Sequence, residues 1–252
     1  MISSKLRIGA SVLVTAVSAK QFSPQSAGAA ASHCGTHGNY FDGEAVAANY
    51  TNQFPTYIGA KDQMYTADAN LCGDDNTLHN FSASWVAIGS NNGYGWAQIG
   101  YITTYISNSE TKIFASQMWD GNPNHSKATV YGNQTYQGEQ HYYSARYFSS
   151  SEKVGVFLDG GQFGQLSSFN PTATWTGPFL PVFFSETGFL EDDMPGISGN
   201  TASYYPTWAL NASNGNWENT PAGLEQLDTP GSSNWSNAQP RSDELLVWTN
   251  TE

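Results

Sequence analysis

The chain has 252 residues, and its 21 acidic and 9 basic side chains give a formal net charge of −12 at pH 7. This balance argues against a nucleic-acid-binding protein, which needs basic patches, and it equally disfavours binding to anionic membrane surfaces. Charged residues make up only 12% of the chain and aromatic residues 14%. That composition is typical of a secreted all-β protein and not of a disordered chain.

The first 29 residues have the pattern of a secretion signal. Lys5 and Arg7 precede an apolar run over residues 8–19, which is too short to span a bilayer. Ala27-Gly28-Ala29 is a cleavage site of the A-x-A type, and cleavage after Ala19 is the alternative. Removal of 1–29 takes away three basic residues and no acid, which moves the formal charge from −12 to −15. We expect a secreted, extracellular protein with one domain over 30–252.

Cys34 and Cys72 are the two cysteines of the chain. In an oxidising compartment we expect them to form one disulfide, which would stabilise the fold by about 3–4 kcal/mol through loop closure. A metal-binding pair and a catalytic thiol are the alternatives. Two cysteines without a nearby pair of histidines do not make a zinc site.

From residue 81 onward, short strand-like segments alternate with turns rich in Gly, Asn and Pro. β-Branched and aromatic residues mark such segments at 81–88, 96–105, 112–119, 128–131, 173–175, 179–187, 203–210 and 244–249. Pro181 removes a backbone donor and indicates an edge or a bulge in its strand. Residues 211–240, rich in Asn, Ser and Gly, predict a long loop-rich region wrapped on the sheet. The pattern as a whole predicts an all-β, antiparallel β-sandwich or jelly roll.

The clearest strand pair lies at 139–163. Its first strand alternates residues onto one face, namely His141, Tyr143, Ala145 and Tyr147. After a short polar loop, Val154, Val156 and Leu158 alternate again, and we expect these three side chains to point into the core. Asp159-Gly160 predicts a type I′ turn into a third strand, because both central residues of that turn need a positive φ.

The same stretch resembles a hairpin of the concanavalin A-like lectin and glucanase superfamily. The resemblance is carried by His-x-Tyr-x-x-x-Tyr at 141–147 and by Val-x-Val-x-Leu-Asp-Gly at 154–160, and it implies a shared fold. The glucanases of that superfamily carry Glu-x-Asp-x-x-Glu or Glu-x-Asp-x-Glu on one strand. This chain has neither string, so their catalytic residues have no positions here.

Motifs of the common hydrolase classes are absent from the sequence. No Gly-x-Ser-x-Gly, His-Glu-x-x-His, phosphate loop or dinucleotide fingerprint occurs. A glycosidase needs two carboxyl groups that face one bond. Glu186 ends an apolar strand and is the first candidate for a catalytic acid, with Asp192 as its candidate partner. The alternative is that both are solvated loop acids.

Glu191, Asp192 and Asp193 form a run of carboxylates that is a candidate calcium site, because Ca²⁺ binds clustered oxygen ligands. The run lacks the spacing of a dedicated calcium loop. Calcium is the one cofactor that the sequence brings into consideration.

Aromatic side chains carry the argument for ligand binding. A sugar ring stacks its C–H groups on Trp or Tyr, while Asn, Asp and Gln bind its hydroxyls. The candidates in or beside Asn- and Ser-rich loops are Tyr204, Tyr205, Trp208, Trp217 and Trp235. Each of these rings has packing in the core as its alternative role.

Three hypotheses follow for function. The first is a secreted, lectin-like sandwich that binds a polysaccharide or glycan without catalysis. The second is a polysaccharide-cleaving hydrolase or lyase that uses Glu186 and a second acid. The third is a structural or interaction protein of the cell envelope. None of the three predicts a nucleic-acid or membrane partner.

Overall fold

The computed structural model describes residues 43–49, 57–72, 80–90, 95–107, 109–122, 124–151, 153–166, 179–188, 192–197, 200–219, 224–229, 235–241 and 243–249. These residues form strands and their connections, and they contain no helix that could cross a membrane. Nearly all of the strand pairs are antiparallel, the pair of β11 with β17 being parallel. The predicted all-β class is confirmed.

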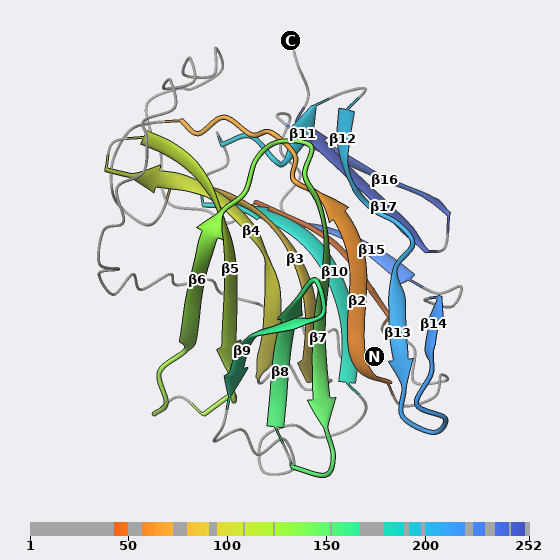
Figure 1. Ribbon diagram of the computed structural model, residues 1–252. Helices are drawn as coiled ribbons and strands as arrows, with labels where there is room; N and C mark the ends of the chain where they lie inside the picture. Colours follow the sequence, from red (N-terminus) through yellow and green to blue (C-terminus); the bar gives the residue numbers. More distant parts are fainter. Residues whose placement is uncertain are drawn as a thin grey trace.

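Thirteen strands are joined into one sheet that folds into two layers (Figure 1). The first layer contains, in spatial order, β6 (Ala128–Gln134), β5 (Ser109–Trp119), β4 (Trp96–Ile106), β3 (Phe81–Ser90), β10 (Phe179–Thr187), β1 (Gly43–Asn49) and β15 (Leu224–Thr229). The second contains β14 (Trp217–Asn219), β13 (Trp208–Asn211), β2 (Tyr57–Tyr65), β7 (Gln140–Phe148), β8 (Lys153–Leu158) and β9 (Gly161–Leu166). A single residue pair, Phe179 with Tyr57, links β10 to β2.

A smaller sheet closes one end of the sandwich. Its strands are β11 (Gly196–Ile197), β12 (Asn200–Tyr204), β17 (Glu244–Thr249) and β16 (Trp235–Arg241). Side chains from β12 and β17, among them Tyr204, Leu245 and Val247, join the apolar core of the two layers.

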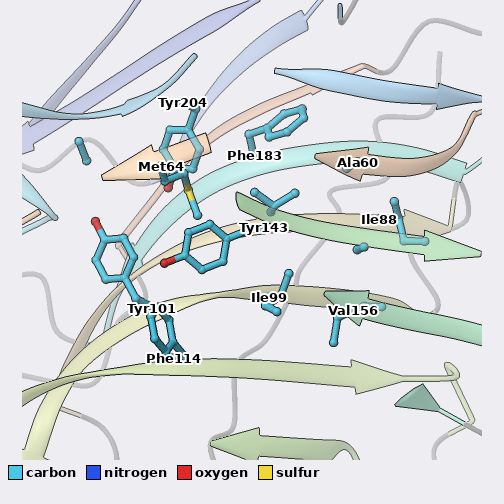
Figure 2. Close-up of a cluster of buried hydrophobic side chains, with 14 of the residues drawn as sticks. Ala60, Met64, Ile88, Ile99, Tyr101, Phe114, Tyr143, Val156, Phe183 and Tyr204 are labelled. Atoms are coloured by element: carbon cyan, nitrogen blue, oxygen red, sulfur yellow. The ribbon is translucent and has the colours of Figure 1, made fainter. Parts of the chain in front are cut away.

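The core lies between the two layers. The first layer contributes Ile99 and Phe183 to it, and the second contributes Tyr143 and Val156, all completely buried. Figure 2 shows Tyr143 of β7 beside Tyr101 of β4, where the layers meet. Because side chains alternate along a strand, the first layer has a second face turned away from this core. That face carries its own buried apolar cluster, including Trp85, Val182 and Phe184.

The strand pair predicted at 139–163 is confirmed in detail. Tyr143, Val154 and Val156 are fully buried in the core, and Tyr147 and Leu158 pack against it. The turn that follows β8 has a φ of 50° at Asp159 and 79° at Gly160, as the type I′ prediction requires.

Several sequence-based predictions need correction. The strand expected at 203–210 is two strands, β12 and β13, separated by residues 205–207. The region 211–240, expected to be loop-rich, contains β14, β15 and the larger part of β16. Strand β2 was not predicted, because its Gly, Lys and Asp residues hide the alternation. Strand β10 lies between β3 and β1 and is not an edge strand. At Pro181, however, it is paired on one side only, with Ile88 of β3, because its pairing with β1 ends at Val182.

Some predictions fall on residues that the structure does not describe. The proposed secretion signal at 1–29, Cys34 and the short strand at 173–175 all lie outside the described ranges. Cys72 is completely buried and is not a free thiol. The Cys34–Cys72 disulfide and the boundary at residue 29 therefore stay predictions.

Hydroxyl groups form a buried network between the layers. The Ser84 hydroxyl lies 3.2 Å from both the Tyr101 and the Ser185 hydroxyl oxygens, and Ser185 lies 2.7 Å from Tyr204. Tyr204 also donates to the Phe184 carbonyl at 2.5 Å. Burial raises the pKa of Tyr101 to about 12, so its phenol stays neutral and can donate. The network fixes β3, β4 and β10 relative to β12.

Asp62 is a buried carboxyl within the second layer. It points inward from β2 and accepts hydrogen bonds from the backbone N–H groups of Gln63 and Tyr205. Burial raises its pKa well above the ordinary value of 3.8, because the charged form loses its hydration. Its Oδ2 atom has no hydrogen-bond partner.

Gly100 is the position in the first layer where a side chain is least tolerable. A Cβ there would lie 1.8 Å from the Ser84 carbonyl oxygen, whereas a Cβ at Gly89 would meet nothing within 4 Å. We expect Gly100→Ala to destabilise the fold by about 3 kcal/mol or more, and Gly89→Ala to change stability by less than about 1 kcal/mol. Urea unfolding of the two variants checks this. Equal midpoints would contradict the packing of β3 against β4.

Asp62 should make the fold more stable in acid. Its folded-state pKa is raised, so its protonated form stabilises the fold fully below about pH 3.8, and this contribution disappears as the pH rises through the folded-state pKa. We expect Asp62→Asn to melt several degrees above the parent at about pH 7 and close to it at about pH 3.5. Thermal melts across this range test the sign. A variant that is less stable at neutral pH would contradict it.

Candidate functional site

Glu186 is a buried carboxyl near the end of β10. Its side chain shares the outer face of the first layer with Val182 and Phe184, because these residues alternate with Phe183 and Ser185, which face the core. Only 2% of Glu186 is exposed. The indole Nε1 of Trp85 donates a hydrogen bond to Glu186 Oε1 over 2.8 Å. The sequence-based choice of Glu186 thus leads to a carboxyl held in place and not to a solvated loop acid.

Trp85 links Glu186 to a second polar residue, Gln98. In the strand register Trp85 lies opposite Phe184 in β10 and opposite Gly100 in β4. Glu186 and Gln98 are each two residues along from those positions, in opposite directions, since Glu186 faces Ala83 and Gln98 faces Ala87. Both are therefore diagonal neighbours of Trp85 on the same face, one on each side of it. Such neighbours have Cα atoms about 7–8 Å apart, within reach of long side chains.

Gln98 is buried and has no hydrogen-bond partner. Its exposed fraction is 0%, and neither its Oε1 nor its Nε2 atom is satisfied. Directly opposite it in β5 lies Gln117, also buried, whose Oε1 atom has no partner either. A buried polar group without a partner costs about 1–3 kcal/mol, and native proteins contain few of them. An unsatisfied amide in the centre of a sheet therefore points to a function and not to packing.

These four residues form one line across the sheet, which we call the carboxyl–amide row: Glu186 of β10, Trp85 of β3, Gln98 of β4 and Gln117 of β5. The surroundings are apolar, with Ala83, Ala87, Ile102, Ala115 and Phe184 on the same face. A carboxyl group in such a place can give and take a proton, and an amide N–H can stabilise an oxyanion. Apolar surroundings strengthen both effects, because water screens charges less there.

A further acid is placed beside Glu186 by the strand register. Glu44 of β1 is the Cα partner of Glu186, so the two residues occupy facing positions on neighbouring strands.

Asp192 and Asp193 have structural contacts. Asp192 Oδ1 accepts from the backbone N–H of Cys72 at 2.8 Å, and Asp193 Oδ2 accepts from the side chain of Asn70 at 2.9 Å. Both carboxylates are buried and tie the segment after β10 to residues 70–72. The printed contact of Asp192 is structural, and its role as the acid partner of Glu186 stays a prediction.

The predicted calcium site is not supported within the part of the chain that the structure describes. No group of three or more His, Cys, Asp or Glu side chains suited to a metal ion occurs among those residues. Glu191, the first residue of the predicted run, lies outside them. Calcium binding stays a prediction.

The five aromatic candidates separate into different environments. Tyr204 is 1% exposed and belongs to the core, which removes it from any exposed stacking site. Tyr205 is exposed, and the Arg241 guanidinium lies 4.9 Å from its ring centroid and donates to its hydroxyl. Trp208 and Trp217 are half-buried, on either side of the Lys61 ammonium. Trp235 begins β16, and its side chain is outside the described part.

No protein-family profile matches the chain, and no curated protein matches its sequence. Its fold is similar to that of SCP-B, a member of the Eqolisin family of peptidases solved with the tripeptide Ala-Ile-His. The TM-score is 0.54 at 9% identity, over 84% of this chain and 100% of that chain. This likeness concerns the fold alone.

Glucanases also occur among the similar structures. A glycoside hydrolase family 16 endo-glucanase from Bacteroides ovatus has a TM-score of 0.37 at 10% identity, over 60% of this chain and 68% of that chain. The β-glucanase of Bacillus licheniformis has a TM-score of 0.34 at 11% identity, over 80% and 69%. Likenesses with scores this low carry no argument about fold or activity.

Gln98 and Gln117 were missed by the sequence analysis. Both lie in strands that were predicted correctly, but glutamine neither titrates nor forms a recognised motif. The available signal was positional: in 96–105 and 112–119, each Gln shares its strand face with apolar residues such as Ile102 and Ala115. A polar residue on an apolar face is the pattern that would have identified them.

The unsatisfied amide of Gln98 makes a prediction about stability. Methionine has a similar length and no groups that need hydrogen bonds, so Gln98→Met should stabilise the fold by about 1–2 kcal/mol. The exposed Gln162 provides the control, since Gln162→Met should change stability by less than about 0.5 kcal/mol. Chemical unfolding of both variants checks this. A destabilised Gln98→Met variant would show that the amide is used for packing.

Proposed function

We propose that the protein is a peptide-bond hydrolase in which Glu186 is the acid–base group and Gln98 stabilises the oxyanion. The single observation that carries the proposal is the unpartnered, buried amide of Gln98 on the same face as the oriented carboxyl of Glu186. A fold shared with a peptidase over that protein's whole length supports the same choice of reaction.

In the first step the Glu186 carboxylate would take a proton from a water molecule, whose oxygen then bonds to the carbonyl carbon of the peptide. The carbonyl oxygen becomes an oxyanion, and the Gln98 Nε2–H group would donate to it. This donor has no other partner, so it needs no rearrangement before it acts. The neighbouring Gln117 amide would orient the peptide backbone by hydrogen bonding.

In the second step the protonated Glu186 would give its proton to the peptide nitrogen. The carbon–nitrogen bond then breaks, with the electron pair leaving on the amine, and the carboxylate is regenerated. The Trp85 indole would hold Glu186 Oε1 and so orient the carboxyl group throughout. A single carboxyl group thus serves as base and then as acid.

A glycoside hydrolase is a second candidate, and the pairing of Glu44 with Glu186 favours it. Retaining glycosidases use two carboxyl groups about 5 Å apart, and the strand register pairs the backbone positions of these two glutamates. In this reaction Gln98 would have no direct part. The two candidate reactions therefore depend on different partners of Glu186.

Carbohydrate binding without catalysis, the first hypothesis from the sequence, would use other residues. Trp208 and Trp217 of the second layer are available to it, and they lie outside the carboxyl–amide row. Whether the protein is a peptidase, a glycosidase or a non-catalytic carbohydrate-binding protein, we propose that residues 1–29 direct its secretion and that it acts outside the cell.

The test compares three variants and one control variant on two substrates. Purified protein is incubated with unfolded casein and, separately, with β-glucan, at pH values from about 3 to 7. New peptide termini are read by mass spectrometry, and sugar release by reducing ends. For a peptidase, Glu186→Gln should lower kcat at least about 100-fold and Gln98→Ala about 100-fold or more. Glu44→Gln and the control Gln162→Ala should retain activity.

The other outcomes are equally distinct. Sugar release that is lost in both Glu44→Gln and Glu186→Gln, but kept in Gln98→Ala, would establish the glycosidase and reject the peptidase. Peptide cleavage that survives Glu186→Gln would place the catalytic group elsewhere. A protein that cleaves neither substrate in any condition would contradict both hydrolytic proposals.

A further inference from the structure

The outward face of the second layer differs in charge from the rest of the molecule. On β2, β7 and β8 the outward positions alternate with the core residues Ala60, Ala145 and Val156. These outward positions include three cations and no carboxylate, the cations being Lys61, Arg146 and Lys153. In a chain with 21 acids and 9 bases, an acid-free face is a local reversal of charge.

The cations on this face have no acidic partners among the described residues. Elsewhere, Lys112 lies 2.6 Å from Asp68, and Arg241 lies 3.7 Å from Glu244. Among the described residues, Lys61, Arg146 and Lys153 take part in no ion pair. Their positive charge is therefore available to a ligand.

Two tryptophan rings enclose the first of these cations. The Lys61 ammonium lies 4.5 Å from the ring centroid of Trp208 and 5.0 Å from that of Trp217. The strand register places Lys61 opposite Trp208. Beside it, Gly59 has no side chain, and a Cβ there would lie 3.1 Å from the edge of the Trp217 ring. The glycine thus lets this ring lie close to the sheet.

A second group of rings lies beside Arg146. Its guanidinium lies 4.7 Å from the ring centroid of Phe148, and Phe148 lies 5.9 Å from Phe157. A Cβ at Gly155 would lie 3.1 Å from the Phe157 ring and 3.2 Å from the Phe148 ring. Here too a glycine in the strand makes room for rings that cover the sheet.

The two groups are parts of one surface. Gly59 of β2 is the strand partner of Arg146 of β7, which brings the tryptophan group and the phenylalanine group together. We call this surface the aromatic–cation face: Lys61, Arg146, Phe148, Phe157, Trp208 and Trp217. Tyr142, 45% exposed, extends it along β7. Three described carboxylates border it: Asp159 in the turn after β8, Asp243 beside Asn219, and Glu218 next to Trp217, which accepts from the Asn211 and Asn214 side chains.

We propose that the aromatic–cation face binds an acidic polysaccharide, such as a chain of uronic acids. Flat rings stack on the apolar faces of sugars, and Lys and Arg pair with carboxylates or sulfates. The inference rests on the carbohydrate-binding candidate above and is independent of hydrolysis at Glu186. It adds the class of sugar and the location of its site.

The charge of the whole molecule favours a polysaccharide over a nucleic acid. Nucleic acids carry a phosphate at every nucleotide and need many basic contacts. This face carries three cations, but the molecule as a whole has a net charge of −12. The surface outside the face would therefore repel a dense polyanion. The pyranose rings of a uronate chain present apolar C–H faces that can stack on Trp and Phe, and each ring carries a carboxylate that Lys or Arg can pair with.

The test measures dissociation constants of the full secreted chain at low salt and about pH 6. The probes are polygalacturonate, a neutral β-glucan and a single-stranded oligothymidylate. We expect polygalacturonate to bind most tightly, and the double variant Lys61→Gln/Arg146→Gln to weaken it about tenfold. Lys127→Gln is the matched control, because Lys127 lies 5.4 Å from the Trp96 ring in the other layer. It should change binding less than twofold.

Each result has one meaning. If the β-glucan binds as tightly as polygalacturonate and the double variant binds both normally, carbohydrate binding stands and the acidic specificity is wrong. If neither polysaccharide binds, the carbohydrate-binding candidate fails together with this inference. If oligothymidylate binds at least as tightly, the face is a general polyanion site and the proposal is overturned. Peptide cleavage by the double variant should equal that of the parent in every case.

Discussion

Strand β10 contributes side chains to both faces of the first layer. Its alternation sends Phe183 and Ser185 into the core and Phe184 and Glu186 to the opposite side. The register with β3 and β1 fixes where Glu186 stands, and the hydroxyl network around Ser185 and Tyr204 fixes the strand. The position of the carboxyl is therefore a consequence of core packing on the other side of the same strand.

The carboxyl–amide row is costly for the fold. Gln98 and Gln117 occupy central positions where apolar side chains would be more stable, and Gln98 has no partner for its amide. Proteins tolerate such groups mainly where a ligand or a reaction uses them. The surrounding apolar cluster of Ala83, Ile102 and Phe184 provides the low polarity in which a single carboxyl and a single amide act most strongly.

The two layers then have separate uses. The first layer carries the proposed reaction on its outer side, and the second carries the aromatic–cation face on the opposite outer side, with the common core between them. Binding at one face would leave the other free. A hydrolase that holds an acidic matrix through its second layer would keep that matrix away from the carboxyl–amide row.

Alternation was the property that the sequence revealed best. It located the inward residues of β7 and β8, while the Asp159-Gly160 pair gave the turn. Apolar composition located the ends of β10 and β17 and selected Glu186, since an acid at the end of an apolar strand stands out. The order of the strands in the sheet could not be predicted from the sequence, because pairs such as Glu44 with Glu186 join residues far apart in the chain. The same reason hid the row through Trp85 and Gln98, and the burial of Tyr204.

The most direct test of the account is a double-mutant cycle on peptide cleavage with Glu186→Ala, Gln98→Ala and the double variant. If the two side chains act on one transition state, the double variant should be hardly slower than the slower single variant. Effects that multiply, so that the double variant loses the product of the two single losses, would mean that carboxyl and amide act independently and would contradict a shared site.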